Sequence, residues 1–245
     1  MIDDSFMTAV FDGRIPETSV LIETILERKD ISLVSVKSQF HISNLYGKEI
    51  RLDILSKDNT GKTYHFEVQR DIEGASAQRA RFTGALIDTT LLNKGQKYED
   101  MSERYTIFIT EKDIFHKNIP LYHVEYKIEE LDNLSFGDGS HIIYVNGTFQ
   151  DLNTQIGQLM HDFFCDKAND IINPVLRERV RYLKETEGGR KEMCEIMENL
   201  INEEKIELAK NAIAKGNLSV EEIADVLDLP LTLVRELAQM NTVCA

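Results

Sequence analysis

The sequence predicts an α/β (α+β) fold followed by a helical C-terminal region. Runs rich in β-branched and aromatic residues, such as 31–40 and 104–110, have the composition of strands. They alternate with stretches such as 77–92, where small and apolar residues recur at helical spacing. From about residue 153 the chain changes to long, charged, helix-like stretches. We therefore expect a core over residues 1–150 and a helical region over residues 151–245.

The elements of the core can be placed in order along the chain. The first helix is expected from Pro16, because proline is favoured in the first helical turn. Strands are expected at 31–40, 51–56 and 63–69, with "KDNTGK" as a hairpin loop between the last two. The helix at 77–92 contains Gly84, which costs about 1 kcal/mol relative to alanine, so we expect it to pack closely against the sheet. Further strands are expected at 104–110, 121–130 and 141–148.

The helical region divides into a long part and a terminal pair. Gly188 and Gly189 indicate a break between two long helices. Ser219 and Glu222 have the spacing of a capping box, and Leu229-Pro230 separates the two short helices of a helix-turn-helix-like pair at 217–240. Helix pairs that read DNA usually carry basic residues on the second helix, whereas this one offers only Arg235. A packing or dimerisation role is therefore expected.

Charge and composition exclude several classes of protein. The net charge of -14 argues against DNA binding through a whole-surface field, so any site for a polyanion must be local. Residues 1–90 carry 14 acidic and 11 basic side chains, so they repel phosphate groups less than the rest of the chain does. The cysteines Cys165, Cys194 and Cys244 are odd in number and widely spaced, which argues against a disulfide framework or a structural zinc site.

The N-terminus and the apolar runs predict a soluble, cytoplasmic protein with no membrane partner. No stretch approaches the roughly 20 apolar residues that span a bilayer. The sequence also begins with "MIDD", where a secretory signal would carry basic residues.

The hairpin at 51–69 carries polar side chains inside strand-like runs. If residues 59–61 form a three-residue loop, facing residue numbers sum to 120, which sets Asp53 opposite Glu67 and Arg51 opposite Gln69. All four side chains would then share one face, with apolar residues on the other. Two facing carboxylates repel, so a divalent metal is a natural partner for them. The alternative is an ordinary solvated sheet face.

The spacing D-x13-E-x-Q at residues 53–69 resembles the PD-(D/E)XK nuclease superfamily. The blocks "RLDILSKDNTGKTYHFEVQR", "GASAQRARFTGALID", "LLNKGQKYEDM", "RYTIFITEKDIF" and "HIIYVNG" together look like its transposases and recombination-promoting nucleases. The resemblance covers about residues 4–185. It implies a restriction-endonuclease-like core, in which a central mixed sheet is flanked by helices.

The same resemblance implies a metal-dependent DNA endonuclease that hydrolyses phosphodiester bonds, with DNA as its partner and Mg²⁺ or Mn²⁺ as its cofactor. It implies that Asp53, Glu67 and the backbone carbonyl of Val68 bind the metal. Gln69 occupies a position where many relatives carry lysine. Because an amide is neutral, its expected catalytic role is to orient the attacking water.

Three further residues complete the predicted site. A glutamate of the first helix contributes in many relatives, and Glu23 is the candidate by position, although it lies about 130° from the apolar face of that helix. Arg79 and Arg81 could bind a phosphate of the substrate through bidentate hydrogen bonds. The alternative for both arginines is a surface ion pair with Asp88 or Glu73.

A second function is compatible with the sequence. Gln69 stands where many relatives carry lysine, and the chain beyond residue 90 has a net charge of -11. Both features would suit a catalytically inactive protein of the same fold. Such a protein would act as an interaction module through its acidic helical tail, and the terminal helix pair is the element expected to form a homodimer.

Overall fold

The computed structural model of the chain describes residues 4–43, 49–70, 72–92 and 94–243. The chain forms two compact units, Met1–Arg190 and Lys191–Ala245. The division lies beyond the expected position near residue 150, because α4 (Gln155–Phe164) and α5 (Pro174–Glu185) pack on helices from the start of the chain. Among the described residues, no helix combines the length and apolar content needed to cross a bilayer.

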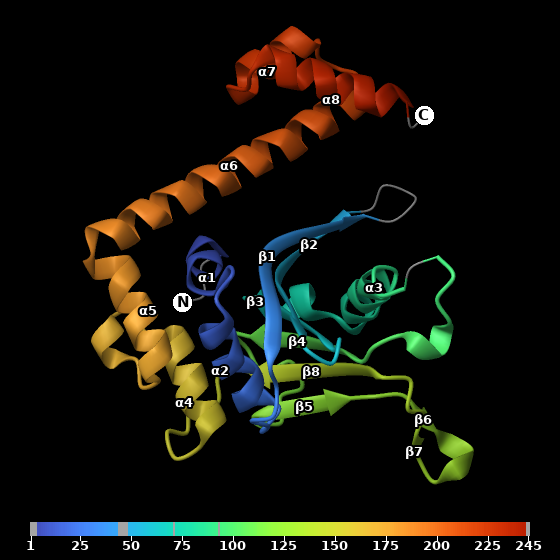
Figure 1. Cartoon of the computed structure of the whole chain (residues 1–245), viewed down its shortest axis with the longest axis vertical. Coiled ribbons are helices and arrows are strands. Elements are labelled where there is room, and N and C mark those ends of the chain that lie inside the picture. The colour runs from blue at the N-terminus through green and yellow to red at the C-terminus, as the bar shows by residue number, and fades with distance from the viewer. Residues whose placement is uncertain (1–3, 44–48, 71, 93, 244–245) are drawn as a thin grey trace. The chain divides into compact units, whose positions relative to one another are not determined.

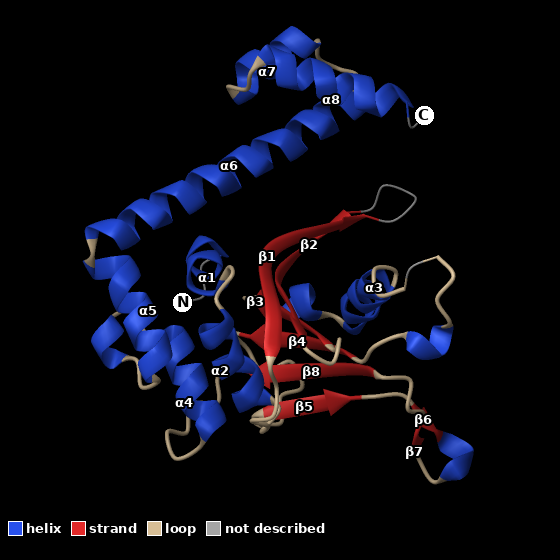
Figure 2. Ribbon diagram, in the orientation of Figure 1, coloured by secondary structure: helices blue, strands red, loops and turns tan. Residues whose placement is uncertain are grey.

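The first unit is built on a six-stranded mixed sheet in the order β1-β2-β3-β4-β8-β5 (Figure 2). The pairs β3–β4 and β4–β8 are parallel, and the pairs β1–β2, β2–β3 and β8–β5 are antiparallel. A separate two-stranded sheet pairs β6 with β7. The strands are β1 (Leu33–Ser43), β2 (Glu49–Asp58), β3 (Thr63–Gln69), β4 (Arg104–Thr110), β5 (Leu121–Val124), β6 (Lys127–Ile128), β7 (Leu134–Ser135) and β8 (Ser140–Asn146). The expected mixed central sheet is confirmed.

Helices flank this sheet, as Figure 1 shows. The helices α1 (Asp4–Phe11), α2 (Ile15–Ile25), α4 and α5 contact one another and form one group. The helix α3 (Ala77–Asp88) lies apart from them and packs on β4 and β1. Helix α1, which the sequence analysis did not predict, is joined to α5 by the Arg179 side chain, which donates to the carbonyl oxygen of Ala9.

Helix α3 lies close to the sheet because its inner residues are small. Ala80 packs on Phe108 and Tyr144. A Cβ atom at Gly84 would lie only 2.6 Å from a guanidinium nitrogen of Arg104, which is a buried side chain of β4. The close packing expected at Gly84 is therefore confirmed, and its neighbour is a charged group.

The turn between β2 and β3 is fixed by a buried carboxylate. Oδ1 of Asp58 accepts hydrogen bonds from the backbone N–H groups of Thr60 and Lys62, and Oδ2 accepts one from the Tyr64 hydroxyl. Gly61 adopts a φ of 91°, a conformation that glycine tolerates and other residues do not. The local sequence thus sets the hairpin register.

The second unit contains most of α6 (Glu187–Lys215), with α7 (Val220–Leu227) and α8 (Leu231–Val243). The capping box of Ser219 and Glu222 is present at the start of α7. The break before α6 falls at Thr186 rather than at Gly188-Gly189, because the Thr186 hydroxyl accepts the N–H of Gly189 and thereby starts the new helix. The core of this unit consists of Ala209, Ile223, Ala224 and Val234.

Candidate active site

The site lies where β2 and β3 separate. Their ladder keeps facing residue numbers that sum to 120, but its register ends at Ile54 opposite Phe66, so the predicted facing pairs Asp53–Glu67 and Arg51–Gln69 are not part of it. Beyond that pair, β2 continues beside β1 while β3 continues beside β4. There Oδ2 of Asp53 accepts a hydrogen bond from the backbone N–H of Val68 at 2.9 Å. At this fork, where β2 and β3 separate beyond Ile54 and Phe66, a side-chain carboxylate therefore takes the place of a main-chain acceptor.

Glu67 is the second acid of the site, and its side chain is only 2% exposed. Its Oε1 accepts hydrogen bonds from Nε2 of Gln69, at 2.9 Å, and from the guanidinium of Arg79. Its Oε2 lies 3.2 Å from Nε2 of the buried His65, without the directional geometry of a hydrogen bond. The buried negative charge is therefore compensated mainly by Arg79, which comes from the first turn of α3.

Both acids line one cavity of about 620 Å³. Arg51, Val68 and Gln69 also line it, together with Arg79 and other residues from the N-terminal half of α3. Because β1 and β2 bend over α3 (Figure 1), Leu52 packs on Leu86 of that helix instead of pointing away from it. The structure thus brings Asp53, Glu67, Val68, Gln69 and Arg79 to one place, while the predicted strict separation of apolar and polar faces does not hold for β2.

Gln69 is held from behind by a short 3-10 helix, Ile72–Ala75. A Cβ atom placed on Gly74 would lie 1.8 Å from Oε1 of the Gln69 amide. The amide therefore fills the space that the missing side chain leaves, while its nitrogen points to Glu67. The Gln69 amide can take this orientation only because residue 74 is a glycine.

Two predicted residues lie elsewhere. Arg81 borders a separate cavity of about 260 Å³, together with Tyr126 and Val124. Glu23 borders a third cavity of about 280 Å³ beside residues of α4. The structure does not bring either side chain to the cavity of Asp53 and Glu67. Asp88, the alternative partner for Arg79 and Arg81, pairs with Arg104, at 2.7 Å.

A second glutamate of α2, Glu17, was not predicted from the sequence. Glu17 is 8% exposed, and its Oε2 has no hydrogen-bond partner among the described residues. It lies on the buried side of α2, together with Thr18, Leu21, Ile22 and Ile25. Helical phase gave only a weak signal for Glu17: it lies one helical turn before Leu21, at the edge of that apolar stripe, whereas Glu23 lies about 130° from the centre of the stripe.

Comparison with known families identifies this arrangement. The sequence model of the PD-(D/E)XK nuclease family transposases matches residues 18–226 of the 245. The chain belongs to this family. The match includes the fork, the helix α3 and the first part of the second unit. No curated protein and no solved structure matched the chain. The expected restriction-endonuclease-like architecture of this PD-(D/E)XK protein agrees with its mixed sheet and flanking helices.

The chemistry of the cavity suits a hard divalent cation. Asp53 and Glu67 offer carboxylate oxygens from two adjacent strands, and oxygen donors are the ligands that Mg²⁺ and Mn²⁺ prefer. A positive group already lies on Glu67, in the form of the Arg79 guanidinium. By charge and donor type, the two carboxylates therefore fit a divalent metal ion.

Proposed function

We propose that this PD-(D/E)XK protein is a metal-dependent DNA endonuclease of the transposase or recombination-promoting type. The observation that carries the proposal is the convergence of Asp53, Glu67 and Gln69 on one cavity at the fork of the sheet. Asp53 and Glu67 would hold Mg²⁺ or Mn²⁺, with the Val68 carbonyl as a further ligand. Such an ion supplies Lewis-acid polarisation of the phosphate and a nucleophilic hydroxide at neutral pH.

The remaining residues would position the reactants. Gln69 donates from its nitrogen to Glu67. Its carboxamide oxygen lies beside Gly74 and, in this proposal, would accept a hydrogen bond from the attacking water. The Val68 N–H fixes Asp53, so that the first carboxylate keeps one orientation. In this proposal neither group transfers a proton, and both act by holding geometry.

Arg79 would have two successive partners. In the free protein its guanidinium neutralises Glu67. Once a cation takes over that neutralisation, the guanidinium, whose side chain is 44% exposed, is free to bind a phosphate oxygen of the substrate. A chain with a net charge of -14 needs such a local positive group to hold a polyanion.

Plasmid cleavage by the full-length chain tests the proposal. With Mg²⁺ or Mn²⁺ it should nick or cut supercoiled DNA, and a chelator should stop the reaction. Asp53→Asn and Glu67→Gln preserve side-chain volume and one acceptor oxygen, so both should fold. Each should lose activity by a factor of at least about 10². Asp88→Asn is a matched control, because this acid pairs with Arg104 and is absent from the cavity lining.

The result that overturns the proposal is cleavage at the parental rate by both acid variants. Retained cleavage by a single variant would remove that residue from the metal site. A parallel pair, Glu17→Gln and Glu23→Gln, tests which glutamate of α2 contributes. Loss of activity in Glu23→Gln alone would support the assignment made from sequence position, and loss in Glu17→Gln alone would support the buried glutamate.

A second candidate function is association through the helical region. Met197, Ile201 and Leu208 are each about half exposed, at 46%, 50% and 49%, and their spacing places them on one side of α6. Burial of this stripe against a second copy would produce the homodimer expected from the sequence. Light scattering of the parent and of Ile201→Glu tests this: a dimer that the variant abolishes supports it, and a monomeric parent removes it.

A further inference from the structure

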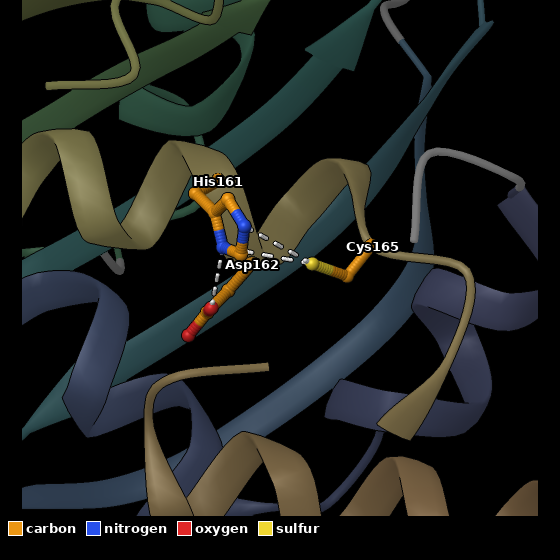
Figure 3. Close-up of side chains that lie close together, drawn as sticks. All are labelled: His161, Asp162 and Cys165. Atoms are coloured by element: carbon orange, nitrogen blue, oxygen red, sulfur yellow. Dashed lines mark hydrogen bonds and ion pairs between the residues drawn. The ribbon is translucent and has the colours of Figure 1, made fainter. Parts of the chain in front are cut away.

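A group of metal-binding side chains lies at the end of α4, outside the cavity of Asp53 and Glu67. His161 and Asp162 occupy the last turn of that helix, and Cys165 is the residue at its C-terminal cap. Figure 3 shows the His161 ring between the Asp162 carboxylate and the Cys165 thiol. One nitrogen, one oxygen and one sulfur atom of these residues lie within 4.8 Å of one another. Cysteine spacing alone gave no indication of this group, because only one cysteine belongs to it.

The distances from His161 to the other two side chains match those between neighbouring ligands of a tetrahedral ion. Nδ1 of His161 lies 3.3 Å from Oδ1 of Asp162 and 3.6 Å from Sγ of Cys165. The carbonyl oxygen of Asp170 lies 3.5 Å from the same sulfur. Zinc bonds of about 2.0 to 2.3 Å in tetrahedral geometry separate neighbouring ligand atoms by roughly 3.3 to 3.7 Å. The two distances from Nδ1 are therefore those of neighbouring zinc ligands, the carboxylate oxygen and the sulfur lie within 4.8 Å of each other, and a fourth donor is at hand.

The carboxylate is held in place by the chain that follows the helix. Oδ1 and Oδ2 of Asp162 accept hydrogen bonds from the backbone N–H groups of Ile172 and Asn173, at 2.6 and 2.8 Å. Oδ2 keeps a second lone pair for a cation, and the second lone pair of Oδ1 faces Nδ1 of His161, where the cation would lie between them. Hydrogen bonds of this kind commonly orient the carboxylates that ligate metals. Asp162 is completely buried, whereas the His161 side chain is 30% exposed and leaves a path to solvent.

The histidine ring needs one adjustment. Sγ of Cys165 lies 3.6 and 3.8 Å from the two ring nitrogens, so it is off the in-plane lone-pair direction of both. A rotation about the Cβ–Cγ bond of the partly exposed His161 turns a nitrogen towards the sulfur, and this torsion is soft. Burial, and then the nearby Asp162 and Asp170, raise the pKa of the Cys165 thiol. A cation would reverse this effect and release the thiol proton to solvent as the metal–sulfur bond forms.

We propose that His161, Asp162 and Cys165 form a zinc site that ties the end of α4 to the 165–173 segment. The mixed nitrogen, oxygen and sulfur donors suit zinc, and cobalt is its spectroscopic substitute. The site is independent of the proposed nuclease activity, because it uses none of the residues of that cavity.

The test uses the full-length chain carrying Asp53→Asn and Glu67→Gln, so that the other acidic cavity does not compete. Zinc titrated against a chromophoric chelator should bind with one high-affinity equivalent and release a proton. Cobalt should give a thiolate-to-metal charge-transfer band. Cys165→Ala and His161→Ala should each weaken zinc binding at least about 100-fold, since even loss of a supporting residue costs 10- to 100-fold.

The matched control is Cys194→Ala, because Cys194 is an exposed free cysteine on α6. It should leave zinc affinity and the cobalt band unchanged. Asp162 is not substituted, because its two backbone hydrogen bonds make a folding defect expected. If Cys165→Ala fails to fold, the partly exposed His161→Ala decides. Equal zinc affinity in His161→Ala and its parent, or a cobalt spectrum without the thiolate band, overturns the proposal.

Discussion

The guanidinium of Arg79 donates a hydrogen bond to Oε1 of Glu67, so the first turn of α3 supplies the positive charge that pairs with this buried acid. Arginine and metal would compete for the same oxygen. Arg79→Ala should therefore raise Mn²⁺ affinity by about 2- to 10-fold, the range expected for a partly exposed ion pair. The same variant should lower DNA cleavage, because it removes the proposed phosphate ligand.

Mn²⁺ binding can be measured by electron paramagnetic resonance without any substrate. Arg81→Ala is the control, because Arg81 borders a different cavity and should leave Mn²⁺ affinity unchanged. Weaker Mn²⁺ binding in Arg79→Ala would contradict the competition and would indicate that Arg79 organises the carboxylates.

Gly74 provides a way to move Gln69 without replacing it. In Gly74→Ala the new methyl group must displace the Gln69 amide, since its Cβ would lie 1.8 Å from Oε1. Displacement by about 1 Å can cost on the order of 10²-fold in rate. We expect similar losses of cleavage rate in Gly74→Ala and Gln69→Ala, with little change in thermal stability. Full activity in Gly74→Ala together with loss in Gln69→Ala would show that the amide acts without a fixed orientation.

Gly84 tests the contact between α3 and the sheet. Alanine normally stabilises a helix by about 1 kcal/mol relative to glycine. Here Gly84→Ala should instead destabilise the first unit by roughly 1 to 3 kcal/mol, because Arg104 must leave its hydrogen bonds with Asp88 and Thr106. Tyrosine fluorescence in urea reports on this unit, since all eight tyrosines precede residue 190 and tryptophan is absent.

A double-mutant cycle provides the control for this effect. In an Arg104→Ala background, the added methyl group at position 84 meets no guanidinium. Gly84→Ala should then be neutral or stabilising. A destabilisation of the same size in both backgrounds would show that the cause is not the contact with Arg104.

Asp58 predicts a pH dependence of stability. Burial acts to raise its pKa, but hydrogen bonds from Thr60, Tyr64 and Lys62 outweigh this and hold the pKa below its usual value of 3.8. Because the folded-state pKa is lowered, the stabilisation is complete above the unfolded-state value of about 4 and is lost as pH falls through the folded-state value. Asp58→Asn should therefore cost roughly 1.5 to 3 kcal/mol at pH 7.

The difference between parent and Asp58→Asn should shrink once the pH falls below about 4. Urea denaturation at pH 7 and in acid measures it through tyrosine fluorescence. A gap that stays constant down to pH 3 would assign the loss to packing rather than to the charge of Asp58.

The hairpin and its register could be predicted from sequence because their causes are local. Turn residues at 58–62 and the composition of the flanking strands act over a few positions, and the register of the ladder followed from them. The alternation of apolar and polar side chains did not predict the position of Leu52, because the bend of β2 over α3 depends on how a distant helix packs.

Contacts between distant segments could not be read from composition. The boundary between the units moved past α5 because Arg179 bonds to Ala9, which lies 170 positions earlier in the chain. Likewise, the pairing of Arg79 with Glu67 and the place of Gly74 against Gln69 depend on tertiary packing. The motif identifies the two acids, and the fold determines which cationic group reaches them.

Strand β3 carries Glu67 and Gln69 and lies between β2 and β4; it pairs with β4 over its whole length and with β2 from Thr63 to Phe66. Its amide hydrogens should be among the slowest in the chain to exchange with deuterium, because they open only when the whole sheet opens. The geometry of the cavity therefore belongs to the cooperative unfolding unit of the core. Heating should abolish cleavage and the β-sheet circular dichroism at one common temperature.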